Sequence, residues 1–512
     1  MMCRTVALAW ITGVLLAGEA APPLGGLPAG GLPGKLAATT YCTQCHALPD
    51  PSHLDRRTWE TELLPKMRVL VGLEKPGPHS GFQDVPLLEA AGVFPAKPLV
   101  PAEAFEAAAR YFLERAPEKT ASVQDQATIA VGMKGFRTEI LPDRHAPPRT
   151  TMVRIDGKRH RLFLGDAGFQ GYNLLNGRLE VTDGVKLANI PTSWAGDAAG
   201  DWFTCIGHFF PREEPRGQVM VMETIAGKLE RRVVLSGLPR LADLKRADLN
   251  GDGRNDLVLC AYGNYVGRFS WFETAADGGL QERMLFDKPG SLRCEAVDFD
   301  RDGHLDLLVL VAQATESLLF FKGDGRGRFE RQTLFQRDPS WGHSGFELAD
   351  FDGDGRLDVL VTNGDNADFN TSPPHSHHGV RIYLNRAGKL EESWFAPMNG
   401  AYRAVARDFD LDGDLDVAAI AFFPDYEASP RESFLYFENT GGKTAWKFSR
   451  STFAECIAGR WLTLDAGDLD GDGDEDLALG SLIEMPTQVP DFLKDSWRRQ
   501  GPSLVVLRNL AR

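Results

Sequence analysis

Two cysteines and a histidine near the N-terminus have a spacing that suits one particular chemistry. Cys42, Cys45 and His46 lie in the stretch YCTQCHALPD and form the pattern C-x-x-C-H. One turn of helix places the two thiols side by side, where they can add across the two vinyl groups of a haem, and the histidine can then ligate the iron. A disulfide or half of a zinc site would use the same cysteines, but no second C-x-x-C and no paired histidine lies nearby. The pattern predicts one covalent haem c.

A second axial ligand is expected further along the same segment. Met67, in TWETELLPKMRVLVG, follows Pro65, which interrupts the helical pattern before it. Its thioether sulfur makes Met67 the predicted second ligand of the iron, with His53 and His79 as the alternatives. The other interpretation of Met67 is an ordinary core methionine.

Alternating carboxylates recur in five acidic segments of the second half of the chain. In ADFDGDGRLDVLV, four aspartates occupy positions one, three, five and nine, and Gly355 lies where the chain must turn sharply. Side-chain oxygens that converge in this way suit Ca²⁺, a hard cation that takes about six to eight oxygen ligands. A single segment of this kind could be an Asp-Gly turn between strands. Five segments in the same register favour metal binding, with about five calcium ions in all.

The predicted calcium ligands are the side chains at these four positions of each segment. They are Asp248, Asn250, Asp252 and Asp256; Asp298, Asp300, Asp302 and Asp306; Asp350, Asp352, Asp354 and Asp358; Asp408, Asp410, Asp412 and Asp416; and Asp468, Asp470, Asp472 and Asp476. Much of the formal net charge of −15 lies in these segments, so we attribute the acidity to metal binding. The same charge argues against a nucleic acid as partner, because its phosphates would repel the protein.

The first residues have the features of an export signal. Arg4 gives a basic start, an apolar run extends from Val6 to Ala17, and Gly18-Glu19-Ala20 offers a small-residue cleavage site. The run is shorter than the ~20 apolar residues that a membrane span needs, and no later stretch is long and apolar enough to span a bilayer. We therefore expect a signal peptide over 1–20, a Pro/Gly-rich leader over 21–34, and an exported mature protein, periplasmic or extracellular, without a membrane span.

Residues 35–118 are expected to form a small all-α domain. The segment PAEAFEAAARYFLERAP places Ala104, Phe105, Ala108, Tyr111 and Phe112 on one face of a helix. With the C-x-x-C-H pattern before it and Met67 between, the region resembles a small class I cytochrome c. That resemblance implies a mono-haem electron-transfer domain. The polar segment that follows, over 119–134, is expected to be a linker.

Strand patterns occupy the remainder, 135–512. Each acidic segment is preceded by one apolar strand and followed by three more, and four strands per repeat of this length predict the blade of a β-propeller. The acidic segments resemble FG-GAP and VCBS repeats, as in the propeller of integrin α-subunits, in which these loops bind Ca²⁺; the literal FG and GAP sequences are mostly missing. Two degenerate repeats without the carboxylate set, through TTMVRIDGKRHRLFLG and SWAGDAAGDWFTCIG, bring the expected number of blades to seven.

The last blade lacks a fourth strand in the sequence that follows it. GFRTEILP, from Gly135, matches the fourth-strand pattern of other repeats, yet it precedes the first blade. We expect it to complete the last blade, because this would close the ring and remove an exposed sheet edge.

Strand order also predicts two different ends of the propeller. The acidic loops join first to second strands, so the opposite end carries the long insertions, where binding sites are usually built. Residues just before the first strands should reach that end, either as a docking surface or as packing in the channel: Trp194, Arg240, Arg293, Trp341, His343, Tyr402, Arg403, Arg460 and Trp461. His375, His377 and His378 lie in one insertion; they could bind a metal, but a flexible polar loop is the favoured interpretation. Cys205, Cys260, Cys294 and Cys456 could form disulfides, and buried free thiols are favoured.

Together these features predict a multidomain protein, with a small all-α cytochrome c domain followed by an all-β seven-bladed propeller. The expected function is electron transfer, with the calcium-stabilised propeller as a docking or recognition scaffold. The partner would be a redox protein or a small-molecule electron donor or acceptor. The alternative is an oxidoreductase whose propeller binds a substrate and passes electrons to the haem. No nucleophile elbow, phosphate loop or separate acid–base pair supports other catalysis.

Overall fold

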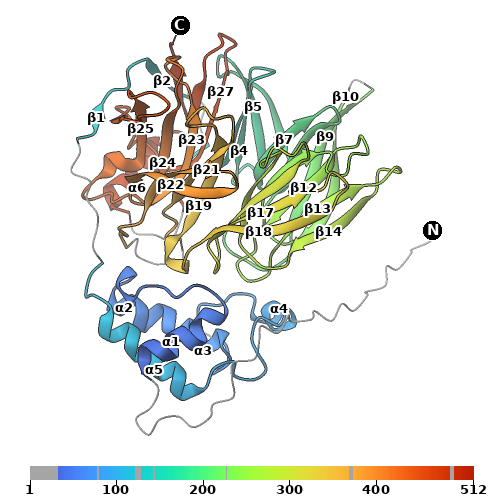
Figure 1. Cartoon of the computed structure of the whole chain (residues 1–512). Coiled ribbons are helices and arrows are strands. Elements are labelled where there is room, and N and C mark those ends of the chain that lie inside the picture. The colour runs from blue at the N-terminus through green and yellow to red at the C-terminus, as the bar shows by residue number, and fades with distance from the viewer. Residues whose placement is uncertain are drawn as a thin grey trace.

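The computed structural model describes residues 33–77, 80–120, 128–141, 145–226, 228–367, 373–484 and 489–511. The predicted signal peptide and nearly all of the predicted leader, like His79, therefore lie outside the described residues. The chain forms a small helical unit below a ring of sheets (Figure 1). None of the helices in the described ranges is long and apolar enough to cross a membrane.

The helical unit is built from short helices around two longer ones. Its elements are α1 (Gly34–Tyr41), η1 (Cys42–Gln44), η2 (Pro51–His53), α2 (Arg56–Thr58), the π-helical turn η3 (Trp59–Leu63), α3 (Leu64–Leu70), α4 (Val85–Ala90) and α5 (Ala102–Arg115). Helices α1 and α5 pack against each other. A Cβ atom at Gly34 would lie 2.6 Å from the carbonyl oxygen of Ala107, so only glycine permits this close approach.

Two apolar clusters hold the helical unit together. Trp59 stacks on Phe112 with 4.4 Å between the ring centroids, and its Nε1 donates to the carbonyl of Pro51 at 2.9 Å. On the other side of α1, Tyr41 packs with Phe105 of α5 and with Met67 of α3. Burying one such large side chain stabilises the folded unit by roughly 1.5–3 kcal/mol.

Within the described residues the strands form seven sheets, one per blade, so the seven-bladed propeller is confirmed. Blade one contains β3 (Thr150–Asp156), β4 (Arg161–Asp166), β5 (Gly171–Asn176) and β6 (Val181–Lys186); blade two β7 (Pro191–Asp197), β8 (Gly200–Cys205), β9 (Gly217–Ile225) and β10 (Lys228–Leu238); blade three β11 (Leu241–Ala247), β12 (Asp256–Ala261), β13 (Arg268–Thr274) and β14 (Leu280–Phe286); and blade four β15 (Ser291–Val297), β16 (Asp306–Val311), β17 (Ser317–Gly323) and β18 (Phe329–Gln336). Blade five contains β19 (His343–Ala349), β20 (Asp358–Asn363), β21 (Gly379–Arg386) and β22 (Lys389–Pro397); blade six β23 (Ala401–Arg407), β24 (Asp416–Ala421), β25 (Phe434–Asn439), β26 (Phe448–Thr452) and β1 (Ala130–Val131); and blade seven β27 (Trp461–Gly467), β28 (Asp476–Ser481), β29 (Leu504–Asn509) and β2 (Phe136–Ile140).

Neighbouring blades bury apolar side chains against each other. The second strand of each acidic repeat is buried throughout, as in DLLVLV of β16, because another blade covers each face of its sheet. The fourth strands are mostly exposed, as in β18. Each pair of adjacent blades shares one apolar cluster, including the pair formed by blades seven and one.

The ring is closed by the strand that precedes blade one. Strand β2 pairs with β29 from Phe136↔Asn509 to Ile140↔Val505, which confirms the predicted closure. Arg508 of β29 is 2% exposed and donates to Glu139 of β2 at 3.0 Å. One part of the expected organisation needs correction: β1, within the segment predicted as a linker, pairs in parallel with β26 of blade six.

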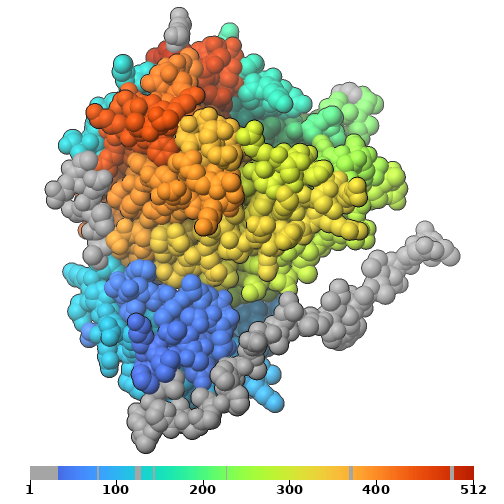
Figure 2. Space-filling model, in the orientation of Figure 1, coloured from blue at the N-terminus to red at the C-terminus, as the bar shows by residue number. Residues whose placement is uncertain are grey.

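The helical unit docks on one end of the propeller, against loops that join second to third strands and against links between blades. Asp84 accepts hydrogen bonds from Arg212 Nη1 at 3.1 Å and from the Glu213 backbone at 2.9 Å. Phe82 packs against Tyr265 at 5.3 Å between ring centroids. In the space-filling view the blue and cyan unit lies directly against the yellow and orange blades (Figure 2). This is the end opposite the acidic loops.

Candidate functional site

The C-x-x-C-H residues follow the end of helix α1. Cys42 begins the turn η1 and is half-buried, whereas Cys45 is exposed, and both are free thiols. Burial, followed by the nearby Cys45, raises the pKa of Cys42 to about 11, so this thiol stays protonated. The packing of α1 on α5 fixes where the two sulfur atoms emerge.

His46 presents one ring nitrogen for ligation. Its Nδ1 lies 2.8 Å from the carbonyl oxygen of Ala47, and since a carbonyl can only accept, Nδ1 carries the proton. No described residue forms a hydrogen bond with Nε2, which therefore keeps its lone pair. Metal-binding histidines generally use this arrangement, in which the second nitrogen donates to a carbonyl and orients the ring.

The candidates for the second axial ligand lie in different places. Met67 is half-buried on α3, beside Tyr41 and Phe105 in the cluster that adjoins α1. His53 instead faces the propeller, where its Nδ1 lies 2.6 Å from Ser340 Oγ. Of these two residues, Met67 is the one whose side chain remains within the helical unit.

The acidic loops share one backbone geometry. The position-one aspartate accepts backbone N–H groups from within the loop; Asp248, for example, accepts from Gly251 and Gly253 at 2.8 Å each. The position-six glycines all have positive φ, which glycine adopts without strain. They are Gly253, Gly303, Gly355, Gly413 and Gly473.

The position-nine aspartates connect each loop to the third strand of its blade. Asp358 is 1% exposed and accepts from the backbone N–H of Phe351 and of Asn385, both at 2.8 Å. Asp416 and Asp476 accept in the same way from Asn439 and Asn509. Burial is the main cause of a raised pKa at this position, to about 6 for Asp358 and Asp476 and about 7 for Asp416.

Carboxylates gather most closely at positions one, three and five. In the described residues, one oxygen from each member lies within 4.8 Å of the others in the groups Asp298, Asp300 and Asp302; Asp408, Asp410 and Asp412; and Asp468, Asp470 and Asp472. In blade five the group is Asp350, Asp352 and Asp358. The loop with Asn250 forms no such group of three acidic residues.

The loops of blades three to five are partly neutralised by basic side chains. Arg254 pairs with Asp252, Lys322 pairs with Asp302 at 2.7 Å, and Arg386 donates to Asp352 at 2.6 Å. Arg254 occupies position seven of its loop, whereas Lys322 and Arg386 lie at the C-terminal ends of the third strands β17 and β21. The third strands therefore end at the same end of the propeller as the acidic loops.

The loops of blades six and seven differ at position seven. Arg254, His304 and Arg356 are replaced there by Asp414 and Asp474, which are 5% and 3% exposed. Arg407, next to Asp408, pairs with Glu347 and with Glu475 of the blade-seven loop instead of with the loop of blade six. Asp408 Oδ1, Asp414 Oδ1 and both oxygens of Asp474 are buried and have no hydrogen-bond partner in the described part of the chain. Burial, then neighbouring carboxylates, raises the pKa of Asp474 to about 7. The predicted ligand set omitted position seven, although the change from Arg or His to Asp is visible in the sequence.

The prediction of a docking surface at the other end of the propeller is wrong for Arg403 and Trp461. Arg403 is 9% exposed and its Nε donates to the Leu464 carbonyl at 2.6 Å, while Trp461 is fully buried in the apolar cluster between blades six and seven. Burial, followed by Arg293 and Arg154, lowers the pKa of Arg403 to about 9. The alternative, packing within the channel and blades, is what these residues show.

Two further expectations about this end have different outcomes. His375, His377 and His378 do not lie in a flexible polar loop but are buried between the propeller and the helical unit. Cys205, Cys260, Cys294 and Cys456 are buried free thiols, as favoured from the sequence. The residues that sequence reasoning did not identify are the docking contacts Asp84, Asp338 and Ser340, for which no motif exists.

Comparison with known proteins identifies the repeats. Residues 248–309 and 298–361 match the family model described as FG-GAP-like repeat, so the chain carries FG-GAP-like repeats in its propeller. Among curated proteins, no match was found. Similar solved structures include BBS1N in complex with ARL6DN, at 9% identity over 74% of this chain and 97% of that chain, with a TM-score of 0.44. The periplasmic gluconolactonase of Pseudomonas aeruginosa is 14% identical over 60% of this chain and 85% of its own, with a TM-score of 0.40. A protein from Lactobacillus plantarum is 12% identical over 68% and 95%, with a TM-score of 0.39.

Proposed function

We propose that the protein is an exported electron-transfer protein in which the helical unit carries one covalent haem c and the propeller serves as a calcium-stabilised scaffold. The observation that carries this proposal is the C-x-x-C-H group at the end of α1, where two free thiols precede a histidine whose Nε2 is available. Cys42 and Cys45 would hold the haem, and His46 and Met67 would hold its iron. When bound, the haem would supply one-electron oxidation and reduction.

The residues present fit such a group. Nδ1 of His46 is held by the Ala47 carbonyl, which orients the ring, and the exposed Cys45 leaves space at the surface for a large planar ligand. Met67 packs beside Tyr41 and Phe105, so a thioether is present within an apolar environment that disfavours water. With both axial positions filled by the protein, electron transfer is favoured over oxygen chemistry.

The acidic loops support calcium as the second cofactor. Buried carboxylate oxygens without partners are costly, about 1–3 kcal/mol each or more for a charged group, and a bound cation would offset this cost. Blades six and seven hold these oxygens at Asp408, Asp414 and Asp474. The loop of blade six is therefore the proposed strong site. The loop of blade seven, where Arg508 pairs with Asp476 at 2.7 Å and lies 3.7 Å from Asp470, and the loops of blades three to five have basic partners and are the proposed weaker sites.

The helical unit covers part of the propeller end where the partner was expected to dock. The electron donor or acceptor would then reach the haem from the side of the unit that faces away from the propeller, or through the insertions of blades five to seven. A cavity of about 460 Å³ lies between those insertions and is lined by Asn399, Phe423 and Tyr426. That cavity favours the second candidate function, an oxidoreductase that binds a small substrate on the propeller and passes electrons to the haem.

Potentiometric titration of the purified protein tests electron transfer. The expected result is a single reversible one-electron wave, with an absorption spectrum that shows both axial positions occupied in each oxidation state. Rapid binding of oxygen or carbon monoxide by the reduced protein would indicate an open coordination position and would contradict the assignment of Met67 together with simple electron transfer.

A further inference from the structure

Three histidines in the loop between β20 and β21 lie together where the propeller contacts the helical unit. His375, His377 and His378 are 4%, 8% and 1% exposed, and one nitrogen of each lies within 4.8 Å of the others. Imidazole nitrogen is a preferred ligand of copper, zinc and nickel. Bonds of about 2.0–2.1 Å to a tetrahedral ion place the nitrogens about 3.4 Å apart, so small rotations of the side chains would bring them to an ion.

Two of the rings are already held as metal ligands usually are. His377 Nε2 lies 2.9 Å from the Ser340 carbonyl and must donate to it, which leaves the lone pair on Nδ1. His375 is hydrogen-bonded to the backbone of His53, in the helical unit. Such hydrogen bonds to carbonyls fix the tautomer and the orientation of a ligating imidazole.

The third ring has no partner at all. Both Nδ1 and Nε2 of His378 are buried and form no hydrogen bond in the described part of the chain. A neutral imidazole has one donor and one acceptor, and leaving a buried group unsatisfied costs about 1–3 kcal/mol. A cation bound to the acceptor nitrogen would satisfy it, and no other group among the described residues does so.

Burial, more than the surrounding charges, keeps the rings neutral. Burial is the largest cause of the lowered pKa of His375 and His377, to about 3 and about 4, so each ring has a lone pair at neutral pH. Arg381 also lowers the pKa of His377 and His378 and would oppose a cation, whereas Asp338 acts in the other direction on His375 and His377. The Arg381 guanidinium is fixed beside the cluster by hydrogen bonds to Asn363 and to the His377 carbonyl, and it lies 4.8 Å from the centroid of the Trp341 ring.

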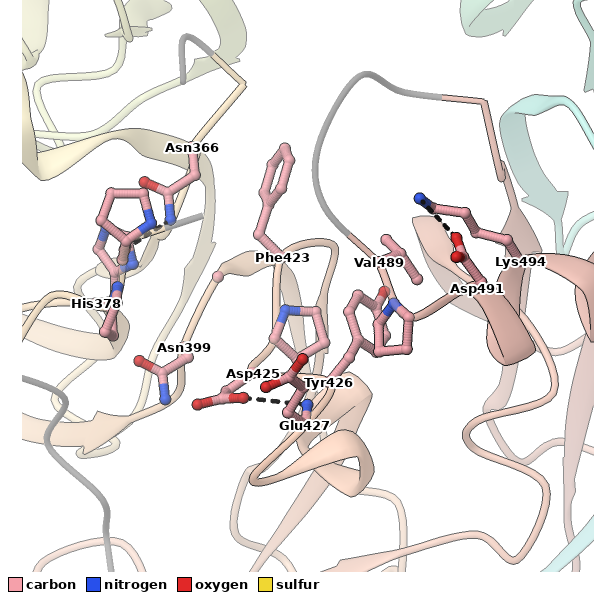
Figure 3. Close-up of a pocket in the computed structure, with 15 residues that line it drawn as sticks. Asn366, His378, Asn399, Phe423, Asp425, Tyr426, Glu427, Val489, Asp491 and Lys494 are labelled. Atoms are coloured by element: carbon pink, nitrogen blue, oxygen red, sulfur yellow. Dashed lines mark hydrogen bonds and ion pairs between the residues drawn. The ribbon is translucent and has the colours of Figure 1, made fainter. Parts of the chain in front are cut away.

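We propose that His375, His377 and His378 form a binding site for one divalent transition-metal ion of the class that imidazole prefers, Cu²⁺ or Zn²⁺, at the junction of the helical unit and the propeller. The ring of His53 lies 4.7 Å from that of His377, so the helical unit closes one side of the site. His378 borders the cavity between the insertions, beside Asn366, whose Oδ1 is also buried and has no hydrogen-bond partner among the residues that the structure describes (Figure 3). This cavity gives the ion a route from solvent. The inference concerns a metal centre separate from the haem and from the acidic loops, and it depends on neither.

Metal titration of the full-length protein tests the site. After treatment with a chelator and dialysis into excess Ca²⁺, the protein is titrated with Cu²⁺ and followed by electron paramagnetic resonance. The expected result is one equivalent of Cu²⁺ with hyperfine coupling to several imidazole nitrogens, and prior loading with Zn²⁺ should require more Cu²⁺ to reach it, because both ions compete for the site. His378→Gln and His377→Gln should each weaken binding about tenfold or more. His304→Gln, at an exposed histidine in an acidic loop, is the matched control and should bind Cu²⁺ as the wild type does.

Two results would overturn the proposal. One is the absence of any nitrogen-coupled equivalent in the wild-type protein, which decides the matter without a variant. The other is an unchanged nitrogen-coupled spectrum in both His378→Gln and His377→Gln. If His378→Gln does not fold, the His377→Gln variant still provides the comparison, because its ring is at the edge of the cluster and less buried.

Discussion

His53 Nδ1 lies 2.6 Å from Ser340 Oγ, and this hydrogen bond joins the helical unit to the link between blades four and five. His53 follows the haem-type motif closely in sequence, whereas Ser340 lies 287 residues after His53. The same ring lies 3.5 Å from the carboxylate of Asp338. The propeller thus holds the segment that follows His46, and the position of the predicted haem depends on the propeller.

Removal of the docking contacts should release the helical unit from the propeller. We expect His53→Ala combined with Asp84→Ala to detach it, because each hydrogen bond lost contributes roughly 0.5–1.5 kcal/mol and the two contact regions are separate. Small-angle scattering should show a larger radius of gyration, and limited proteolysis should cut faster between the two units. Asp277→Ala combined with His304→Ala removes two exposed side chains elsewhere and serves as the control. Identical scattering curves for the two double variants would contradict the assigned interface.

Ring closure by β2 predicts different behaviour for two shortened chains. A chain that begins at Thr128 retains β1 and β2 and should give a soluble monomer. One that begins at His145 loses β2, which exposes the edge of β29 and leaves Arg508 without Glu139, so we expect aggregation. Size-exclusion chromatography makes the comparison. Equal monomer yields would mean that the ring is stable without β2.

The substitution Asp408→Asn, in the loop of blade six, should change Tm in different directions with and without Ca²⁺. With Ca²⁺ at about a hundred times Kd, one site stabilises the folded state by about 2.7 kcal/mol, and Asp408→Asn should lose most of this and lower Tm. In a chelator the same substitution removes one of several neighbouring negative charges, so Tm should stay equal or rise. Calorimetry with and without chelator measures both effects.

Asp298→Asn is the matched variant for this comparison. It changes the same loop position in blade four, where Lys322 already pairs with the neighbouring carboxylates. Its loss of calcium-dependent stability should be smaller than that of Asp408→Asn. A Tm that does not respond to chelator in the wild-type protein would show that the loops are turns only.

The sequence predicted the propeller well because its signals are local and repeated. The period of the acidic segments, the all-apolar second strands and the glycine at position six each constrain the same blade, and GFRTEILP matched the pattern of a missing strand. The sequence could not predict β1 in blade six, because the two residues of this strand, Ala130 and Val131, carry no recognisable strand pattern.

The candidate sites were predicted unevenly for related reasons. Motifs with fixed spacing predicted Cys42, Cys45 and His46 as haem ligands and the acidic loops as calcium sites, and these remain predictions. The burial of Arg403 and of the histidine loop was not predictable, because it depends on which surfaces the helical unit and neighbouring blades cover. Polar residues at such a junction have no periodicity that would mark them as buried.

Met67 should determine the axial coordination. Met67→Ala is expected to abolish the weak sulfur-to-iron absorption band at the red end of the oxidised spectrum and to lower the reduction potential, because a thioether ligand favours the reduced iron. Val69→Ala, on the same helix, is the control for loss of packing and should retain the band. A band that persists in Met67→Ala would assign the ligand to another residue.

Covalent attachment of haem tests the central claim most directly. The full-length protein is expressed with export and with a haem-attachment system, extracted with acid and acetone, and examined by mass spectrometry and by its spectrum in alkaline pyridine. We predict the mass of one haem added to the mature chain and a c-type spectrum that survives extraction. Cys42→Ala combined with Cys45→Ala should lose both signals, whereas Cys205→Ala, at a buried free thiol of the propeller, should keep them. A wild-type protein without attached haem, or one whose haem is extracted into the organic phase, would contradict the account.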